Sequence, residues 1–157
     1  MEIRPVNSKN RQQVNDFIRL HWFSTDMVVR GEIVDLTVLN GFAVYDEEDL
    51  TGLITYRISE DECEITSLDS LKENQGIGTS LINKVKEEAV KHNCKKIKLI
   101  TTNDNINALR YYQKRGFDMT HIYPNALDLS RRLKPSIPLT GNYGIPLKHE
   151  IEFEMNL

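Results

Sequence analysis

The run Asn74-Gln75-Gly76-Ile77-Gly78-Thr79 decides the fold of this chain. The segment 62–68 before it has the pattern of a strand, and the apolar residues after it recur at helical spacing. Glycines at a strand-to-helix turn leave backbone N–H groups at the helix start without intrahelical partners, at the positive end of the helix dipole. Glycine also lets a ligand approach the backbone closely, because it has no Cβ. We therefore expect this turn to bind a phosphate group.

The segments around this turn predict a mixed α/β fold. Three expected strands, at about 41–46, 50–58 and 62–68, are joined by short turns, which indicates an antiparallel meander. The helix 78–92 then leads to a strand at 96–102, and such a helical crossover requires parallel strands. The remaining expected elements are a helix with Ser8 as its N-cap, a short helix within 24–38, a helix at 106–115 that ends at Gly116, a strand at 117–123, a short helix at 124–133, a loop at 135–147 and a strand at 149–155 with one solvent-facing side. We expect one domain over residues 1–157.

Composition and charge exclude several classes of protein. The chain has 157 residues, of which 39% are hydrophobic and 27% charged, as in ordinary soluble domains. A net charge of −3 provides no long-range attraction for nucleic acid or for an anionic membrane surface. No stretch approaches the roughly 20 apolar residues of a membrane span. No apolar segment follows the N-terminal charges, so we expect no signal peptide.

The cysteines and histidines indicate neither a disulfide nor a metal. Cys63 and Cys94 are isolated in apolar segments, which predicts buried free thiols in a reducing, cytoplasmic compartment. Neither has a histidine placed to form a dyad, so we expect no acetyl-cysteine intermediate. The four histidines show no ligand spacing, so we expect no metal site.

A second motif narrows the choice of phosphate ligand. A P-loop requires a lysine after the second glycine, and a dinucleotide turn requires a third glycine where this chain has Leu81. After the strand at 96–102 the chain reads Asn105-Ile106-Asn107-Ala108-Leu109-Arg110-Tyr111-Tyr112-Gln113-Lys114-Arg115-Gly116-Phe117. Asn105 and Tyr112 are two helical turns apart and lie on one stripe of a helix. Taken alone, this segment favours a structural role, with Asn105 as an N-cap and Tyr112 as a core residue.

The two motifs together closely resemble the GNAT superfamily of N-acetyltransferases. The resemblance consists of the Gln-Gly-Ile-Gly turn and of Asn-x-x-Ala-x-x-x-Tyr-x-x-x-Gly-Phe after the next strand, and it covers residues 62–117 in detail. It implies a mixed α/β, GNAT-like (acyl-CoA N-acyltransferase) fold, with an antiparallel meander leading into a splayed parallel strand pair and helices on both faces. It also implies acetyl-CoA as cosubstrate and transfer of the acetyl group to a primary amine in a ternary complex.

The resemblance implies a set of coenzyme A contacts. Backbone amides of the glycine turn would hold the pyrophosphate, main-chain groups at the end of strand 62–68 would pair with the pantetheine arm, and the second motif would contact that arm and the thioester. The residues concerned are Leu68, Asp69, Asn74, Gln75, Gly76, Ile77, Gly78, Thr79, Asn105 and Tyr112. One departure is Glu73, where the family usually has Gln or Arg. We expect its carboxylate to point into solvent.

For catalysis, the resemblance implies a base, an acid and a backbone donor. Glu64 is the first candidate for the general base, because it aligns with a strand carboxylate that some family members use, and Asp69 is the second. A backbone N–H near Leu68 or Asp69, released by a strand bulge, would stabilise the developing oxyanion. Tyr112 would protonate the departing thiolate.

The acceptor stays open at this level. In the family it is bound by the first helical region and by the connection between the last two strands, here about residues 20–36 and 124–147. Trp22 and Arg30 are the candidate substrate contacts, and the second connection is also a candidate for pairing subunits in a homodimer. A small-molecule amine and a protein amino group are both consistent with the sequence. The competing hypothesis is a non-catalytic acyl-CoA-binding sensor or scaffold domain.

Overall fold

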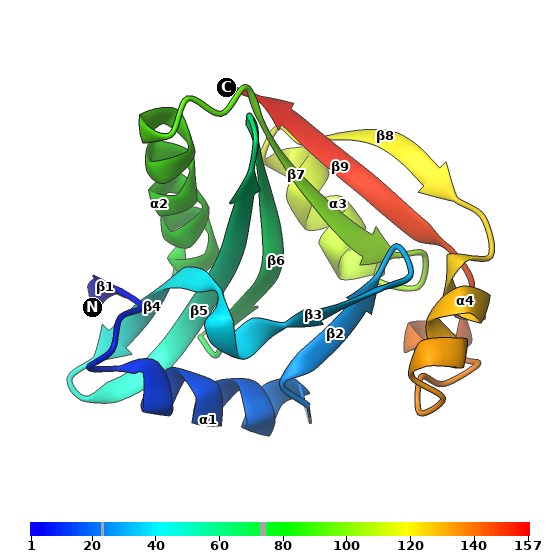
Figure 1. Ribbon diagram of the computed structural model, residues 1–157, viewed down its shortest axis with the longest axis horizontal. Helices are drawn as coiled ribbons and strands as arrows, with labels where there is room; N and C mark the ends of the chain where they lie inside the picture. The colour runs from blue at the N-terminus through cyan, green and yellow to red at the C-terminus, as the bar shows by residue number, and fades with distance from the viewer. Residues whose placement is uncertain (23, 73–74) are drawn as a thin grey trace. The chain divides into compact units, whose positions relative to one another are not determined.

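The computed structural model describes residues 1–22, 24–72 and 75–157, and Figure 1 traces the chain. Helices and strands mix throughout the sequence. In chain order the elements are β1 (Glu2–Pro5), α1 (Arg11–Trp22), β2 (Asp26–Val29), β3 (Glu32–Asp35), η1 (Leu36–Val38), β4 (Asn40–Asp46), β5 (Asp49–Ser59), β6 (Glu62–Ser70), α2 (Ile77–Lys91), β7 (Lys96–Thr102), α3 (Ile106–Lys114), β8 (Asp118–Tyr123), α4 (Ala126–Leu133), η2 (Asn142–Gly144) and β9 (Glu150–Asn156).

Seven of the strands follow one another in the hydrogen-bonded order β1-β4-β5-β6-β7-β9-β8, and β2 pairs with β3 separately. The chain divides into two compact units, one of residues 1–27, 35–97 and 157, the other of residues 28–34 and 98–156. Strand β7 contributes its first two residues to the first unit and the rest to the second. The expected meander and helical crossover into β7 are present, which confirms the mixed α/β fold class.

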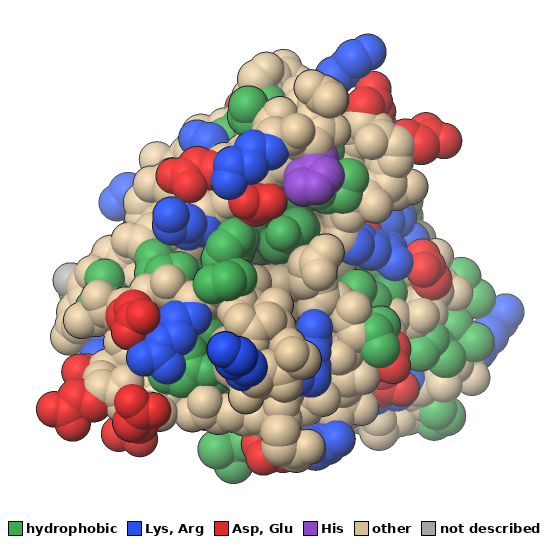
Figure 2. All heavy atoms as spheres, turned by 60° about the vertical axis from the view of Figure 1, so that its left-hand side comes forward, with side chains coloured by type: hydrophobic (Ala, Val, Ile, Leu, Met, Phe, Trp, Pro, Cys, Tyr) green, Lys and Arg blue, Asp and Glu red, His purple; other side chains and the backbone are tan. Residues whose placement is uncertain are grey.

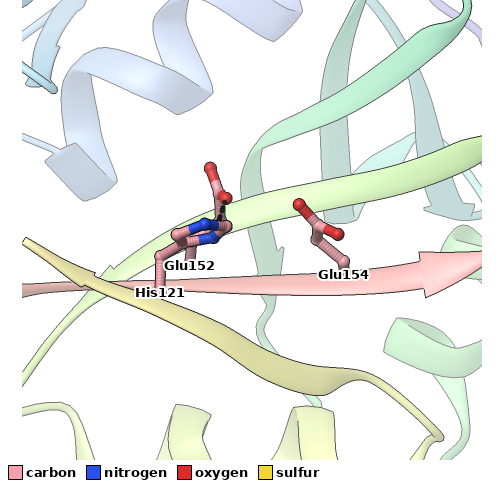
Figure 3. Close-up of side chains that lie close together, drawn as sticks. All are labelled: His121, Glu152 and Glu154. Atoms are coloured by element: carbon pink, nitrogen blue, oxygen red, sulfur yellow. Dashed lines mark ion pairs between the residues drawn. The ribbon is translucent and has the colours of Figure 1, made fainter.

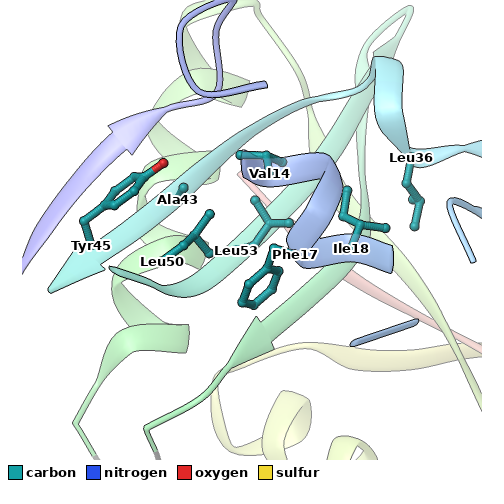
Figure 4. Close-up of a cluster of buried hydrophobic side chains, with 8 residues drawn as sticks. All are labelled: Val14, Phe17, Ile18, Leu36, Ala43, Tyr45, Leu50 and Leu53. Carbon is teal, nitrogen blue, oxygen red and sulfur yellow. The ribbon is translucent and has the colours of Figure 1, made fainter. Parts of the chain in front are cut away.

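In the first unit, helices cover both faces of the antiparallel strands β4, β5 and β6. A Cβ at Gly52 of β5 would lie 2.7 Å from Ile77 Cγ2, so this face of β5 packs against α2. The next residue, Leu53, points to the other face, where it joins the core beneath α1. Figure 4 shows this cluster of buried side chains, which consists of Val14, Phe17, Ile18, Leu36, Ala43, Tyr45, Leu50 and Leu53.

A β-bulge in β6 changes which side chains share a face. Thr55 of β5 lies opposite Ser67 and Tyr56 lies opposite Ile65, so Thr66 is the extra residue. The Thr55 hydroxyl contacts Thr66 Oγ1 at 2.7 Å and Ser67 Oγ at 2.5 Å. We predicted the bulge beside Leu68 and Asp69. It lies earlier in the strand, at Thr66, where the hydroxyls of Thr66 and Ser67 both contact Thr55.

In the second unit, β8 pairs antiparallel with β9, and α3 contacts β8. The aromatic ring of Tyr112 on α3 packs against Phe117 and Phe153, with ring centroids 5.6 Å and 5.8 Å away. Gly116, after the end of α3, has a φ of 91°, the left-handed conformation predicted for it. This packing fixes the helix of the second motif through its apolar stripe.

Two local expectations were wrong, and one strand was not predicted. Residues 24–38 form mainly the hairpin β2–β3 instead of a short helix, because Arg30 and Gly31 take left-handed φ values of 49° and 72° that produce a tight turn. Helix α1 begins at Arg11, so its N-cap position is Asn10 and not Ser8. Strand β1 was not predicted at all, since four residues carry little periodicity of their own.

The last strand was also wrong in one respect. Its alternating pattern predicted a solvent-facing side, but Glu150 and Glu152 are only 2% and 5% exposed. Their carboxylates are buried against partners from other segments, described below. Among the described residues, no helix is both long and apolar enough to cross a membrane.

Candidate functional site

The turn before α2 has the geometry expected of a phosphate-binding loop. Gly76 is exposed and takes the left-handed φ of 72° as the N-cap of α2, without a side-chain cap among the described residues. Among the residues that the structure describes, none has an atom within 4 Å of a Cβ built on Gly76, so they leave this backbone open to a ligand. The first turn of α2, all of which the structure describes, contains no acidic side chain. These features fit a diphosphate group at the helix N-terminus.

The residues of this turn differ in their burial. The side chain of Ile77 is 2% exposed and packs into the core, which fixes the start of the helix. Gln75 is exposed, whereas Gly78 and Thr79 are half-buried in the first turn of α2. Asn74 and Glu73 lie outside the described residues, so the predictions about their side chains stay predictions.

Glu64, the first candidate for the general base, is engaged in an ion pair. Its Oε1 accepts a hydrogen bond from Arg57 Nε at 2.8 Å, and the Glu64 side chain is only 6% exposed. The two residues lie directly opposite each other on β5 and β6. The Glu64 side chain therefore does not face solvent. The Glu64 carboxylate is thus occupied by the Arg57 guanidinium as a protein partner.

Asp69, the second candidate, is in a different environment. Its Oδ2 accepts a hydrogen bond from Trp22 Nε1 at 2.7 Å, which brings the end of α1 onto the end of β6. Burial raises the pKa of the Asp69 carboxyl above its ordinary value, and the Trp22 hydrogen bond and the charge of His21 oppose that rise. A carboxylate with a raised pKa is better matched to taking up a proton near neutral pH. Trp22 is thus a hydrogen-bond partner of Asp69, and its predicted contact with the acceptor stays a prediction.

Arg30, the other predicted acceptor contact, is held by two buried glutamates of β9. Its backbone N–H, at the left-handed turn of the β2–β3 hairpin, donates to Glu150 Oε1 at 3.0 Å. Its guanidinium lies 3.6 Å from Glu152 Oε1. These contacts explain why the alternating glutamates of β9 are buried, and they leave the Arg30 charge largely neutralised.

The same strand contributes the one group of described side chains that could hold a metal ion. His121, Glu152 and Glu154 place a ligand atom each within 4.8 Å of one another (Figure 3). His121 Nδ1 lies 3.0 Å from Glu152 Oε2, and Tyr123 donates its hydroxyl to Glu152 Oε1 at 3.3 Å. Since Arg30 also lies beside this carboxylate, Glu152 already has three protein partners.

The second motif builds the N-terminal end of α3. Asn105 Oδ1 accepts a hydrogen bond from Ala108 N at 3.2 Å, so Asn105 is the N-cap of this helix. Tyr112 is half-buried in the aromatic packing of α3. The local roles of both residues, as cap and packing residue, are thus present. Their proposed contacts with the coenzyme stay predictions.

Asp104, next to the second motif, organises the long connection between α4 and β9. Its side chain is buried, and its Oδ2 accepts hydrogen bonds from Asn142 N at 2.8 Å and from Asn142 Nδ2 at 3.1 Å. Thr102 Oγ1 donates to its Oδ1 at 2.5 Å. The predicted loop over 135–147 is therefore tied to the end of β7. Sequence reasoning missed Asp104 because the pairing spans 38 residues.

Comparison with known proteins decides which family this arrangement belongs to. Residues 13–117 match the sequence model of the Acetyltransferase (GNAT) family, which is well over half of the chain. The chain belongs to the GNAT family of acetyltransferases. The family prediction from the two motifs is thereby confirmed, and the family's cosubstrate is acetyl-CoA.

The chain is also similar to individual proteins over nearly its whole length. The GNAT chain is 45% identical over 154 residues to the uncharacterized protein YdhI of Bacillus subtilis strain 168, covering 98% of this chain and 96% of that protein. Its fold resembles a GNAT family acetyltransferase from Elizabethkingia anophelis with acetyl-CoA bound, with a TM-score of 0.71 at 21% identity over 99% and 97% of the two chains. It also resembles the aminoglycoside 6'-N-acetyltransferase from Enterococcus faecium, with a TM-score of 0.69 at 18% identity over 99% and 97%.

The surface and the thiols of this GNAT acetyltransferase complete the description. On the face shown in Figure 2, acidic and basic side chains are interspersed. Cys63 and Cys94 are free and buried. Burial raises the pKa of the Cys63 thiol to about 12 and also raises that of Cys94, so both thiols are unreactive near neutral pH.

Proposed function

We propose that this GNAT acetyltransferase moves the acetyl group of acetyl-CoA to the nitrogen of a primary amine by direct attack in a ternary complex. Family membership supports acetyl transfer, and the open left-handed turn at Gly76 supports binding of a coenzyme diphosphate. Acetyl-CoA supplies an activated acetyl thioester when bound. A single domain over residues 1–157 and a cytoplasmic location stay predictions.

In this proposal the backbone amides of Gln75–Thr79 hold the diphosphate, and Leu68 and Asp69 offer main-chain groups to the pantetheine arm as an added strand does. Gly76 supports the first assignment, because its backbone is exposed and no described atom lies within 4 Å of a Cβ built there. Asn74, Asn105 and Tyr112 complete the proposed coenzyme contacts by resemblance to the family. Arg30 stays a proposed acceptor contact. Because its guanidinium is paired with Glu152, the contact would be made by the part of its side chain that is exposed.

The attacking amine must lose a proton, which makes the base the critical group. An alkylammonium with a pKa near 10.4 is only about 0.04% neutral at pH 7, a deficit of roughly 4.6 kcal/mol. We assign this role to Asp69, because burial raises its pKa, whereas Glu64 neutralises Arg57. Asp69 accepts the proton directly or through a water molecule. Tyr112 donates its hydroxyl proton to the departing thiolate.

The test is release of free coenzyme A thiol when acetyl-CoA is mixed with amines. The panel contains a polyamine, an aminoglycoside, free amino acids and peptides with a free N-terminus or lysine, and mass spectrometry identifies the N-acetyl product. The buried cysteines contribute little thiol signal of their own. We expect amine-dependent release that falls about a hundredfold or more in Asp69→Asn.

The competing function is a sensor or scaffold that binds acyl-CoA without turnover. It is favoured if calorimetry detects coenzyme A binding while no amine increases thiol release. A chain that binds neither coenzyme A nor acetyl-CoA at millimolar concentration, although folded, contradicts both functions.

A further inference from the structure

A hydrogen bond joins the end of α1 to the end of β6. The indole of Trp22, the last residue of α1, donates its N–H to Asp69 Oδ2 at 2.7 Å. Trp22 also packs against the hydrophobic cluster beneath α1, so its ring is held from the core side. A donor fixed in this way holds the carboxylate in one orientation, because the hydrogen bond engages one specific oxygen.

The bulge at Thr66 is what brings Asp69 to this helix. Glu64 and Asp69 are five residues apart, so in a regular strand they would point to opposite faces. The extra residue restores them to one face of the sheet. Glu64 lies opposite Arg57 and Asp69 lies opposite Leu53, and these two partners on β5 are four residues apart, so they share a face. The face is that of α1, because Leu53 belongs to the cluster under this helix.

We propose that Trp22 is a positioning residue for Asp69: its indole N–H fixes Oδ2 and leaves Oδ1 directed toward the proton of the acceptor ammonium. This inference rests on the proposed function, in which Asp69 is the base. It assigns to Trp22 a role that acts through Asp69, in addition to the predicted contact with the acceptor.

The pKa of the Asp69 carboxyl depends on the groups around it and on its hydrogen bond from Trp22. From α1, His21 is the titratable group whose positive charge lowers the pKa of the Asp69 carboxyl, and its ring packs on Phe17 with centroids 4.3 Å apart. From β5, the residue opposite is the apolar Leu53, and within β6 the nearby Ser67 hydroxyl is bound to Thr55. A hydrogen bond to the ionised form lowers a carboxyl pKa, so loss of the indole N–H raises the pKa of Asp69 further.

The first test is the Trp22→Phe variant, which keeps an aromatic ring and removes the N–H. We expect the acidic limb of the kcat/KM profile to move to higher pH and kcat to fall by about tenfold or more, with little change in the KM for acetyl-CoA. Tyr45→Phe is the matched control. It removes a hydrogen bond of 2.9 Å to Gln13 on the same helix, away from Asp69, and leaves the profile unchanged. An unmoved acidic limb in Trp22→Phe overturns the proposal.

The second test does not depend on turnover. Trp22 is the only tryptophan of the chain, so intrinsic indole emission reports on this site alone. Titrated from about pH 4 to pH 8, the emission of the folded protein is expected to show a transition that is lost in Asp69→Asn and kept in His21→Gln and Glu64→Gln. A transition that persists in Asp69→Asn overturns the coupling.

The two tests separate the inference from the function it rests on. If no amine is acetylated but the emission transition requires Asp69, the proposed function is wrong and the Trp22 contact is structural. If amines are acetylated and the acidic limb stays fixed in Trp22→Phe, the function stands and the positioning role fails.

Discussion

Arg57 Nε donates to Glu64 Oε1 at 2.8 Å across the β5–β6 pair, and this contact separates the two candidate bases of the strand. Glu64 forms an ion pair with the Arg57 guanidinium and its side chain is almost fully buried, whereas Asp69 accepts a hydrogen bond from the neutral indole N–H of Trp22. Both carboxylates lie on the same face of the strand. Their chemistry differs because their partners differ, so each can be tested with an isosteric amide.

We expect Glu64→Gln to affect stability more than turnover. The amide leaves the Arg57 guanidinium without its counter-charge, which lowers the free energy of unfolding by about 1–3 kcal/mol. The value is below that of a fully buried pair, because the Arg57 side chain is 26% exposed. Urea denaturation and steady-state kinetics measure the two effects. A hundredfold loss of kcat without loss of stability would make Glu64 the base.

Asp69→Asn is expected to stabilise the folded protein at neutral pH while it removes activity. Burial raises the folded-state pKa of Asp69, so the stability present below the ordinary aspartate pKa is lost as pH rises through the folded-state value. The amide keeps an acceptor for Trp22 and carries no charge. The difference in unfolding free energy between variant and wild type should therefore grow with pH and then level off.

The control for this pH dependence is Asp118→Asn on β8. Asp118 is exposed, so there the same substitution removes a charge that is not buried. Urea denaturation at a series of pH values measures both variants. If the Asp69→Asn difference is the same at every pH, the carboxyl does not ionise differently in the folded and unfolded states, and its raised pKa is refuted.

Tyr112→Phe removes a proton donor and keeps the ring that packs on Phe117 and Phe153. We expect turnover to fall by about ten- to a thousandfold, with coenzyme A affinity and stability largely retained. Tyr111→Phe is a matched control on the same helix, because the Tyr111 hydroxyl is buried without a hydrogen-bond partner among the described residues. Equal turnover in Tyr112→Phe and wild type would remove the phenol from the mechanism.

Gly76→Asp places a carboxylate where we expect the coenzyme diphosphate. Aspartate and asparagine tolerate the left-handed φ of 72° better than most residues, so the turn is expected to persist. The negative charge should weaken coenzyme A binding by about 1–4 kcal/mol, measured by calorimetry, relative to the uncharged Gly76→Asn.

Gly144→Asp is the control for the substitution itself. Gly144 has a similar φ of 70° and equally open surroundings, but it lies in η2. We expect this variant to bind coenzyme A like the wild type. If Gly76→Asp and Gly76→Asn bind with the same affinity, the turn does not hold the diphosphate.

Much of the fold was predictable because its signals are local. The boundaries of β7 were predicted to the residue, and those of α2 and α3 to within one residue at each end, since apolar periodicity and helix caps depend on neighbouring residues. The β2–β3 hairpin was missed, because its turn uses Arg30, a non-glycine residue at positive φ, whose N–H is bound by Glu150 from 120 residues away. No local pattern reports such a partner.

The sequence by itself determined the glycine turn, the second motif and hence the GNAT family, because backbone conformation at glycine and helical spacing are written in consecutive residues. Only the tertiary structure decided how the carboxylates of β6 are used. Counted along the strand, Glu64 and Asp69 should face opposite sides. The bulge at Thr66 shifts the register against β5, so Glu64 meets Arg57 and Asp69 meets Trp22. Register depends on pairing between strands, and pairing joins residues that no local pattern connects.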